Sequence, residues 1–561
     1  LTFGGFNTTT SSTAVITGQL NVPTVVINQG ANVAATGTDT LQIGSGGTTG
    51  SFSGNIILNG EWSNGGANNS ATLWRTAKLE FRRSDGYILQ PTQTISLAQQ
   101  TLGGIQVGGS TGNTVNTASL LYVNVSGTGL ETNGATINLS NLSPIASGSG
   151  ASIKVATAVN DSLLVINGNS TVNTAYLGIV EDSASYRGSI RQDNGTVNVG
   201  QLRVGHWTNL GTYTLNGGTF NVYSDSPGLT VSPVQGGAYE MFGGMYVAID
   251  GTGTFMQNGG KVSTNFIGVD VRGANATLST YNLYGGSLGI RSGYGIGTPN
   301  NIASALFNFG QAGSAAPTTV TATGGASGQA TITTASTTGL AVGQTVTGTG
   351  IPVGTTITAI NPGVSFTLSA NLTATAAGSV VATSGGLLAI DNTGRGALAG
   401  TNLNVPIFVP GFVAGSGVVV STNGTGNQFT LSRELTGAGT LNFAGGGTIN
   451  LMPAASYGQA INASLAGANP LVKLGAGSTY LWNANAISGG LTVRQGLLGI
   501  NNAGALGTGA LVIAENSSTQ LDNTTGAAVT VSTANTINLN ADFAYVGTNS
   551  AALNLGTGST V

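Results

Sequence analysis

The sequence contains no cysteine and very little charge. The lack of cysteine in 561 residues excludes a disulfide framework and a zinc site built on thiolates. Only 6% of the residues are charged, with 15 Lys and Arg against 18 Asp and Glu. Nucleic-acid binding relies on clustered basic side chains that neutralise phosphates. A net charge of −3 with so few basic residues therefore argues against a nucleic-acid partner.

Long apolar runs and amphipathic helical patterns are missing as well. No uninterrupted apolar run of about 18 residues occurs, so we expect no transmembrane segment in this chain. The chain begins at Leu1 without a basic leader, and we expect that any signal peptide has been removed or lies outside this sequence. Thr, Val, Ile and Asn outnumber the good helix formers, which favours strands over helices.

Glycine and alternating apolar residues are what the sequence has in abundance. Gly accounts for 92 residues, and hydrophobic residues make up 40% of the chain. Much Gly and little charge can indicate disorder, but the apolar residues recur with the period of two that is typical of strands with one buried face. The sequence therefore predicts an all-β protein with a real core.

A short sequence motif occurs four times between residues 188 and 290. Each copy alternates polar and apolar residues, breaks at a Gly or Asn-Gly corner, and alternates again. The corner glycines are Gly195, Gly218, Gly260 and Gly286, which lie 23, 42 and 26 residues apart. If 42 residues are two turns of 21, each repeat is one coil of a parallel β-solenoid. Such a unit cannot bury its apolar face alone and must stack on its neighbours.

Changes in composition and in the repeat pattern divide the chain into four segments. Residues 1–160 are predicted to form irregular β-helix coils, and 161–314 the regular repeats. Residues 315–384 are rich in Ala, Thr and Gly and contain their own alternating strands, so we expect a small, inserted, β-sandwich-like domain. The phrase at 338–368 within it resembles a small β-module of bacterial surface and phage tail proteins. Residues 385–561 return to the β-helix pattern.

Residues 471–513 carry the most specific motif. Gly475-Ala476-Gly477 leads into a strand, Ser488-Gly489-Gly490 forms a turn, and Leu491-Thr492-Val493 and Leu497-Leu498-Gly499-Ile500 follow. This order resembles the autotransporter-associated β-strand repeat of bacterial passenger domains. The 188–290 motif resembles the tandem Gly-Gly-Thr repeats of long secreted bacterial proteins. Both resemblances imply a right-handed parallel β-helix exported to the cell surface.

Residues for catalysis are few. His206 is the only histidine, and no partner residue lies at a spacing typical of a triad or a metal site. Some β-helices cleave polysaccharides with paired carboxylates or with calcium and a basic residue. Here the acids each follow a short apolar run, so they are better explained as caps of strand ends. The candidate residues for such a polysaccharide-cleaving site are Glu181, Asp182, Arg187, Arg191, Asp250, Asp270 and Arg272.

Aromatic residues provide the candidate contacts. Tyr213, Phe255 and Tyr281 share one repeat position, which predicts an interior stack. Outward aromatic side chains are candidate contacts for glycans or partner proteins: Trp62, Trp74, Tyr223, Tyr246 and Tyr284. Residues 61–85 also concentrate seven charges beside the two tryptophans. We interpret that segment as a solvated strand pair or loop, with a contact patch or salt-bridge network as the alternative.

These patterns support two functional hypotheses. The first, which we favour, is a non-enzymatic structural or adhesive rod on a bacterial surface, without a cofactor or metal, that self-associates side by side or end to end. Such a subunit is secreted and contributes to a filament, a sheath or an adhesin, with surface glycans as possible partners. The alternative is a polysaccharide-binding or polysaccharide-cleaving β-helix. Two carboxylates about 5–10 Å apart in a groove would favour cleavage.

Overall fold

The structure is a computed structural model that is all-β. Its described residues form strands and one short 3₁₀ turn, η1 (Thr548–Ser550), and contain no α-helix. None of them belongs to a helix with the length and apolarity needed to span a membrane. The structure describes residues 1–3, 12–28, 37–59, 61–64, 72–97, 119–139, 152–180, 186–206, 209–222, 244–249, 251–270, 278–291, 295–297, 305–310, 316–391, 401–404, 407–408 and 419–556.

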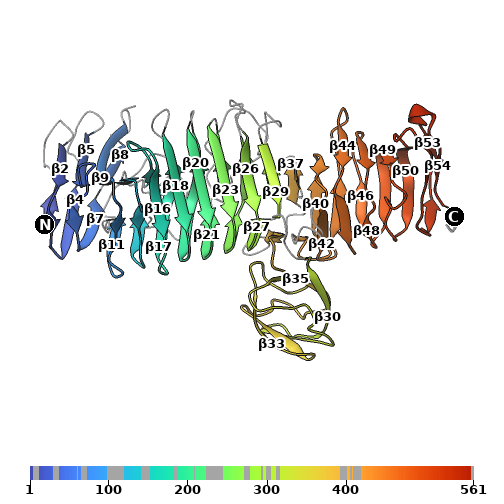
Figure 1. The fold of residues 1–561 in the computed structure, drawn as a ribbon, viewed down its shortest axis with the longest axis horizontal. Coiled ribbons are helices and arrows are strands. Elements are labelled where there is room, and N and C mark those ends of the chain that lie inside the picture. The colour runs from blue at the N-terminus through green and yellow to red at the C-terminus, as the bar shows by residue number, and fades with distance from the viewer. Residues whose placement is uncertain are drawn as a thin grey trace. The chain divides into compact units, whose positions relative to one another are not determined.

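The chain folds into two compact units. Unit 1 comprises Leu1–Met256, Ile267–Ser279 and Pro299–Ser304, and unit 2 comprises Gln257–Phe266, Thr280–Thr298 and Ala305–Val561. Within each unit the strands stand side by side (Figure 1) and pair in parallel, each with the equivalent strand of the next coil. This pairing confirms the prediction of an all-β fold with stacked parallel strands.

Three rows of parallel strands make up unit 1. The first row contains β1 (Thr2–Phe3), β4 (Thr24–Asn28), β7 (Asn55–Asn59), β11 (Thr94–Leu97), β14 (Thr136–Leu139), β17 (Thr171–Ile179), β19 (Thr196–Val204) and β21 (Thr219–Val222). The second contains β2 (Ser12–Ile16), β5 (Gly37–Ile43), β9 (Thr72–Arg83), β12 (Ser119–Val125), β15 (Ser152–Val155), the second halves of β17 and β19, and β22 (Gly244–Val247). The third contains β10 (Tyr87–Ile88), β13 (Leu130–Glu131), β16 (Ser162–Ile166), β18 (Arg187–Gln192) and β20 (Leu210–Leu215).

Unit 2 repeats the three-row plan. One row contains β24 (Lys261–Thr264), β27 (Ser287–Arg291), β36 (Leu387–Asp391), β39 (Val419–Ser421), β42 (Thr440–Ala444), β45 (Ser464–Gly467) and β48 (Ala486–Ile487). The next contains β28 (Gly295–Gly297), β37 (Thr401–Asn404), β40 (Gln428–Leu431), β43 (Thr448–Leu451), β46 (Leu471–Lys473), β49 (Leu491–Ile500), β50 (Leu511–Asp522) and β52 (Ile537–Leu539). The last contains β29 (Ala305–Phe309), β38 (Ile407–Phe408), β41 (Leu435–Thr436), β44 (Gly458–Ile461), β47 (Ser478–Leu481), parts of β49 and β50, and β53 (Phe543–Tyr545).

The length of a coil varies more than the repeat suggests. Leu202 of β19 pairs directly with Met245 of β22, with no coil between them. The interpretation of the 42-residue gap as two turns of 21 is therefore wrong, because those residues belong to one long coil. Its extra length falls in 223–243, outside the described residues. Unit 2 also contains coils of unequal length: Leu471, Leu491 and Leu511 are successive partners 20 residues apart, whereas Leu387 and Val419 are partners 32 residues apart.

The four predicted corner glycines all adopt positive φ, with values of 81° at Gly195, 78° at Gly218, 66° at Gly260 and 69° at Gly286. Successive corners lie very close together. A Cβ on Gly218 would stand 2.3 Å from the Gly195 carbonyl oxygen. This backbone conformation and this lack of space both require glycine. The corner prediction is confirmed.

Stacked side chains fill the interior. The rings of Tyr213 and Phe255 stack in unit 1 with centroids 4.9 Å apart, and those of Tyr281 and Phe307 stack in unit 2 at 5.0 Å. All four residues are fully buried. The prediction that Tyr213, Phe255 and Tyr281 point into the core is confirmed. Offset or parallel aromatic pairs at this distance add to the energy of burial.

An inserted sheet interrupts the coils of unit 2 between β29 and β36. Its six antiparallel strands have the order β32-β35-β30-β31-β34-β33. They are β30 (Thr318–Gly324), β31 (Thr331–Thr334), β32 (Thr345–Thr347), β33 (Ile357–Asn361), β34 (Ser365–Leu368) and β35 (Gly378–Thr383).

The two edges of the inserted sheet meet. The Val346 amide donates to the Thr355 carbonyl at 2.9 Å, and the Ile357 amide donates to the Gln344 carbonyl at 3.0 Å. The insert is thus one sheet closed on itself around an apolar core, which corrects the sandwich-like expectation. Closure is by a single bridge, between Thr345 and Thr356, and these two hydrogen bonds.

The insert packs against neighbouring coils of unit 2. Val353 and Val381 of the insert form a buried apolar cluster with Leu387, Ala389, Val419 and Ala444. The hydroxyls of Thr347 and Ser421 hydrogen-bond at 2.6 Å in the same region. These contacts hold the closed sheet to the strands that flank it.

Replacing Gly218 by Ala tests the corner constraint. The methyl group would face the Gly195 carbonyl and sit on a left-handed backbone, so we expect a loss of about 2–4 kcal/mol in the free energy of unfolding. Urea denaturation followed by circular dichroism measures this loss. Gly47→Ala is the matched control, because a Cβ there meets nothing within 4 Å. Equal stability of the two variants would contradict the constraint.

Candidate functional site

The outward face of the second row in unit 1 gathers cations and tyrosines. Along this row the inward residues, such as Leu79, Leu121 and Leu202, are fully buried. Their neighbours point outward, because side chains alternate along a strand. Parallel register places one outward residue per coil in line: Gln42, Glu80, Tyr122, Lys154, Gly178, Arg203 and Tyr246. We call Lys78, Glu80, Tyr122, Lys154, Tyr176, Arg203 and Tyr246 the cation–tyrosine face.

Contacts across the coils tie this face together. The Lys78 ammonium lies 2.9 Å from a Glu80 carboxylate oxygen and 4.2 Å from the centroid of the Tyr122 ring. The Lys154 ammonium approaches the same ring at 5.8 Å. The Arg203 guanidinium lies 5.1 Å from the ring of Tyr176. Alternating a cation with an aromatic ring avoids the repulsion that stacked like charges would cause.

Burial limits what this face can bind. Tyr246 is only 4% exposed, and Glu80 is 5% exposed. The sequence-based prediction of Tyr246 as an outward contact therefore holds for its direction, but its ring is not available to a ligand. The Glu80 carboxylate is also committed, because it accepts a hydrogen bond from the Asn124 amide at 2.9 Å. Glu80 and Tyr246 are thus shielded from ligands, whereas the other residues of the cation–tyrosine face are half-buried.

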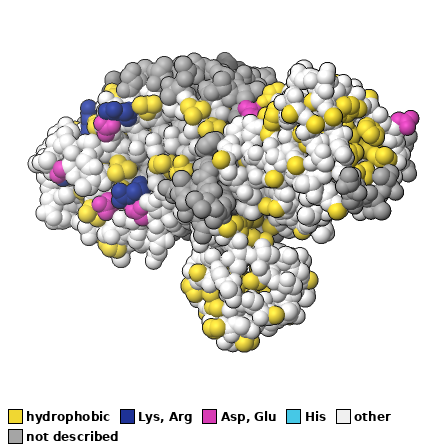
Figure 2. Space-filling view, turned by 45° about the vertical axis from the view of Figure 1, so that its right-hand side comes forward, with side chains coloured by type: hydrophobic (Ala, Val, Ile, Leu, Met, Phe, Trp, Pro, Cys, Tyr) yellow, Lys and Arg dark blue, Asp and Glu magenta, His cyan; other side chains and the backbone are white. Residues whose placement is uncertain are grey.

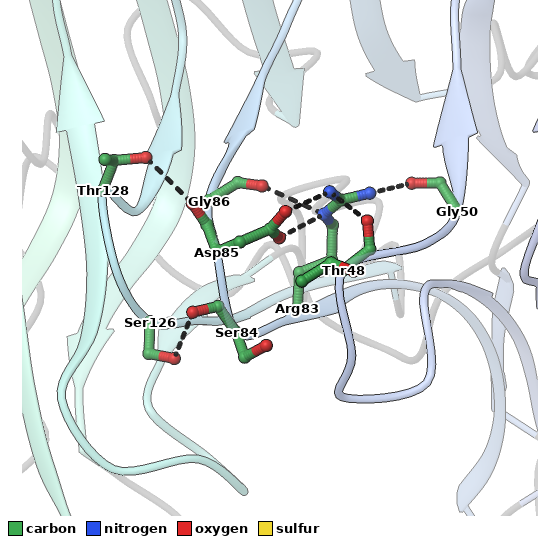
Figure 3. Close-up of polar contacts among 8 residues, drawn as sticks. All are labelled: Thr48, Gly50, Arg83, Ser84, Asp85, Gly86, Ser126 and Thr128. Atoms are coloured by element: carbon green, nitrogen blue, oxygen red, sulfur yellow. Dashed lines mark hydrogen bonds and ion pairs between the residues drawn. The ribbon is translucent and has the colours of Figure 1, made fainter.

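Arg83 organises the other half of the charged segment (Figure 3). Its guanidinium donates to the carbonyls of Gly50 at 2.5 Å and Thr48 at 2.7 Å, one coil away. It also pairs with both carboxylate oxygens of Asp85 at 2.9–3.0 Å and donates to the Gly86 carbonyl. The segment therefore contains the salt-bridge network that we named as the alternative. Arg83 and Asp85 close the corner at the end of β9.

Of the remaining predicted contact residues, the structure describes the side chain of Tyr284 but not those of Trp62, Trp74 and Tyr223. Trp62 and Trp74 lie opposite each other in the antiparallel pair formed by β8 (Glu61–Asn64) and β9, and their side chains lie outside the described set. Tyr223 lies outside the described residues. Tyr284 is half-buried at a corner, where its amide donates to the Gln257 carbonyl at 2.9 Å. Tyr284 is the one predicted contact whose described side chain remains partly exposed.

The candidate catalytic acids are not brought together among the described residues. Glu181, Asp182, Asp250 and Arg272 lie outside them, and Asp270 is 1% exposed at the end of β25 (Phe266–Val269) with a φ of 51°. Arg187 and Arg191 form exposed ion pairs with Asp161 and Asp193. His206 is half-buried, and its carbonyl accepts from the Asn209 amide. The described part of the chain holds no group of three or more potential metal ligands.

Two interior features were not predicted, and the first is a pair of tyrosine–glutamine hydrogen bonds. The hydroxyls of Tyr213 and Tyr281 each donate at 2.7 Å to the side-chain oxygen of a glutamine one coil earlier, Gln192 and Gln257. Each glutamine in turn donates to a backbone carbonyl, that of Thr219 or Ser287. The signal was present in the sequence, since both glutamines precede an Asn-Gly or Asn-Gly-Gly corner of the repeat.

Lys473 is the second unpredicted feature. It is completely buried, and its ammonium donates to the carbonyls of Leu474, Gly475 and Gln495 at 2.8–2.9 Å. Three acceptors match its three N–H donors. Burial lowers the pKa of the Lys473 ammonium to about 8. The residue joins two successive coils at a corner of unit 2.

Comparison of the chain with protein-family models, with curated protein sequences and with solved structures finds no match. The surface itself is sparing in charge. Figure 2 shows charged side chains in a few small groups on a visible face that is otherwise mostly neither charged nor hydrophobic. The functional argument for this chain therefore rests on its own geometry.

Replacing Arg83 by Lys tests the corner network. Lysine cannot reproduce the bidentate contact or reach two carbonyls at once, so we expect a loss of about 1–3 kcal/mol in the free energy of unfolding. Urea denaturation provides the measurement. Arg187→Lys is the control, because the Arg187–Asp161 pair is 60–64% exposed and should contribute little. A loss as large in the control would show that the corner has no special role.

The buried tyrosines predict an alkaline effect. Burial raises the pKa of Tyr213 and of Tyr281 well above the ordinary value near 10. In the unfolded chain both ionise near pH 10, so the free energy of unfolding should fall above pH 10 by up to about 1.4 kcal/mol per pH unit for each tyrosine.

Comparison with the double variant Tyr213→Phe, Tyr281→Phe isolates this effect from other groups that titrate there. At neutral pH the variant should lose about 1 kcal/mol per site, because each glutamine loses its donor. Above pH 10 its urea midpoint should decline less steeply than that of the wild type. Parallel declines would contradict the assignment.

Proposed function

We propose that this chain is a non-enzymatic structural or adhesive subunit of a bacterial surface fibre, built as a right-handed parallel β-helix. The observation that carries the proposal is how the interior polar groups are used. Gln192, Gln257 and Lys473 each make hydrogen bonds to the next coil, and their other hydrogen bonds hold backbone carbonyls of their own coil. Groups used in this way stabilise the stack and are not free to act on a substrate.

The outer face supports self-association. Asn138, Asn173, Asn198 and Asn221 occupy one position in four successive coils of unit 1 and are half-buried. Each side-chain amide donates to the one before it, at 3.4 Å for the first pair and 2.8 Å for the other two. Such ladders present donors and acceptors at the coil spacing of about 4.8 Å. A surface with the same spacing, such as another copy of this chain, is the natural partner.

Export to a bacterial surface is supported by the motif at 471–513 and by composition. In the structure this motif forms β46, β47, β49 and the start of β50, which pair in consecutive parallel coils. Coils stabilised by their own ladders need no disulfides. A chain without cysteine can therefore be stable outside the cell.

Sedimentation velocity over a dilution series, with negative-stain electron microscopy, tests self-association. We expect concentration-dependent assemblies that persist in 0.5 M salt, because few charges take part. Asn198→Lys should weaken assembly at least tenfold by pushing a long charged side chain out of the Asn ladder. Gly47→Lys adds the same charge at an open position and should assemble like the wild type. A monomer at every concentration would overturn the proposal.

A further inference from the structure

A groove in unit 2 runs across four successive coils. Its volume is about 560 Å³, and its lining residues come from the corner before β47, from β49, from β50, and from β53 and the residue before it. Gly496 pairs with Thr519, and Thr519 pairs with Phe543, which places the lining in register from coil to coil. The lining residues are Ala476, Gln495, Gly496, Ser518, Thr519, Gln520, Asp542, Phe543 and Ala544.

The lining is polar and repeats with the coils. Gln495, Ser518, Gln520 and Asp542 are all exposed, and they supply amide, hydroxyl and carboxylate groups. Phe543 is half-buried and offers apolar ring surface at the same place. Among the described residues, no Lys or Arg lines the groove, and the Asp542 carboxylate is the one charged group of that lining. Polar groups near an aromatic ring are typical of sites that bind sugars, whose hydroxyls need partners and whose C–H faces are apolar.

The floor of the groove is rigid backbone. A Cβ on Gly496 would lie 2.4 Å from the Gly477 carbonyl and 2.9 Å from the Lys473 ammonium. The Lys473 ammonium holds the carbonyls of Gly475 and Gln495 on either side of this contact. The groove therefore keeps its form without a ligand, which lowers the entropic cost of binding.

Thr519 turns its side chain away from the groove. The residue is 4% exposed, and among the described residues its hydroxyl oxygen has no hydrogen-bond partner. A buried hydroxyl without a partner costs about 1–3 kcal/mol. In β50 Thr519 lies between the exposed Ser518 and Gln520, so its side chain points to the opposite face of the strand and a ligand in the groove would not reach its hydroxyl.

We propose that this groove binds a segment of a neutral, linear polysaccharide lying along the coil stack. The coil spacing of about 4.8 Å repeats the polar contacts, which suits a polymer of similar sugar units rather than a single small molecule. The Asp542 carboxylate, together with the absence of Lys and Arg from the described lining residues, disfavours acidic sugars. Gln495, Gln520 and Asp542 would contact hydroxyls, and Phe543 would contact a ring face. This inference does not depend on self-association of the chain.

Isothermal titration calorimetry with the full chain tests the proposal. The probes are neutral β-linked and α-linked gluco-, manno- and xylo-oligosaccharides of one to six units, with hexagalacturonate as the acidic comparison. We expect binding of at least one neutral series, with affinity that rises at least tenfold from the monosaccharide to the tetrasaccharide. Hexagalacturonate should bind at least tenfold more weakly than the best neutral hexamer. No binding of any neutral oligosaccharide, or equal binding of monomer and hexamer, would overturn the proposal.

Four variants locate the binding. Gln520→Ala and Phe543→Ala should each weaken binding at least fivefold, and circular dichroism checks that both are folded. Thr519→Val removes a hydroxyl that points into the coil, so it should bind like the wild type and leave the urea midpoint unchanged or higher. Arg494→Ala is the control, because Arg494 is exposed next to the groove but does not line it. Wild-type affinity in both Gln520→Ala and Phe543→Ala would place any binding elsewhere and overturn the assignment.

Discussion

The close approach of successive coil corners governs this structure. Ladder hydrogen bonds set the distance between coils at about 4.8 Å, and the corners must follow at the same distance. A Cβ at Gly286 would lie 2.2 Å from the Gly260 carbonyl, as close as the corresponding contact between Gly218 and Gly195 in the other unit. The chain therefore turns with positive φ at residues that have no side chain. At these corners glycine is thus a direct result of the stacking distance rather than a sign of flexibility.

Stacking also restricts which side chains fit at the other positions, because each side chain packs against the equivalent side chain of the next coil. Asparagine is suited to this, since its amide can donate to one neighbour and accept from the other, as Asn173 does between Asn138 and Asn198. Aromatic rings stack face to face. A charge directly above a like charge is unfavourable, so charges are rare. Where they occur they alternate with other groups: Glu80 lies between Gln42 and Tyr122, and Lys154 lies between Tyr122 and Gly178.

The features that stacking dictates could be predicted from the sequence, and the features outside the stack could not. Alternation, the corner glycines and the interior position of Tyr213 follow from local rules that every coil repeats. The length of a coil does not follow from these rules, because lengthening the connection between two ladder strands costs little entropy. The distance of 42 residues between Gly218 and Gly260 therefore does not reveal that they are corners of successive coils. The shielding of Tyr246 depends on what covers an outward face, and the closure of the insert depends on pairing between residues far apart, such as Val346 and Thr355. The groove was missed because Gln495, Ser518 and Asp542 share no motif and meet only through register.

Periodicity connects the stability of this protein to its surface chemistry. Inside the coils, repetition uses up polar groups: the Gln192 amide and the three donors of Lys473 all hold backbone or a neighbouring side chain. Outside, the same repetition displays a row of side chains at a fixed spacing, whose chemistry is free to vary because it does not enter the core. In unit 1 one such row is uniform and joins its own amides. In unit 2 the row through Gln495, Ser518 and Asp542 differs from coil to coil and leaves its polar groups exposed. A uniform row is satisfied by itself or by a copy of itself, whereas a varied row on a rigid floor needs a different partner with the same spacing.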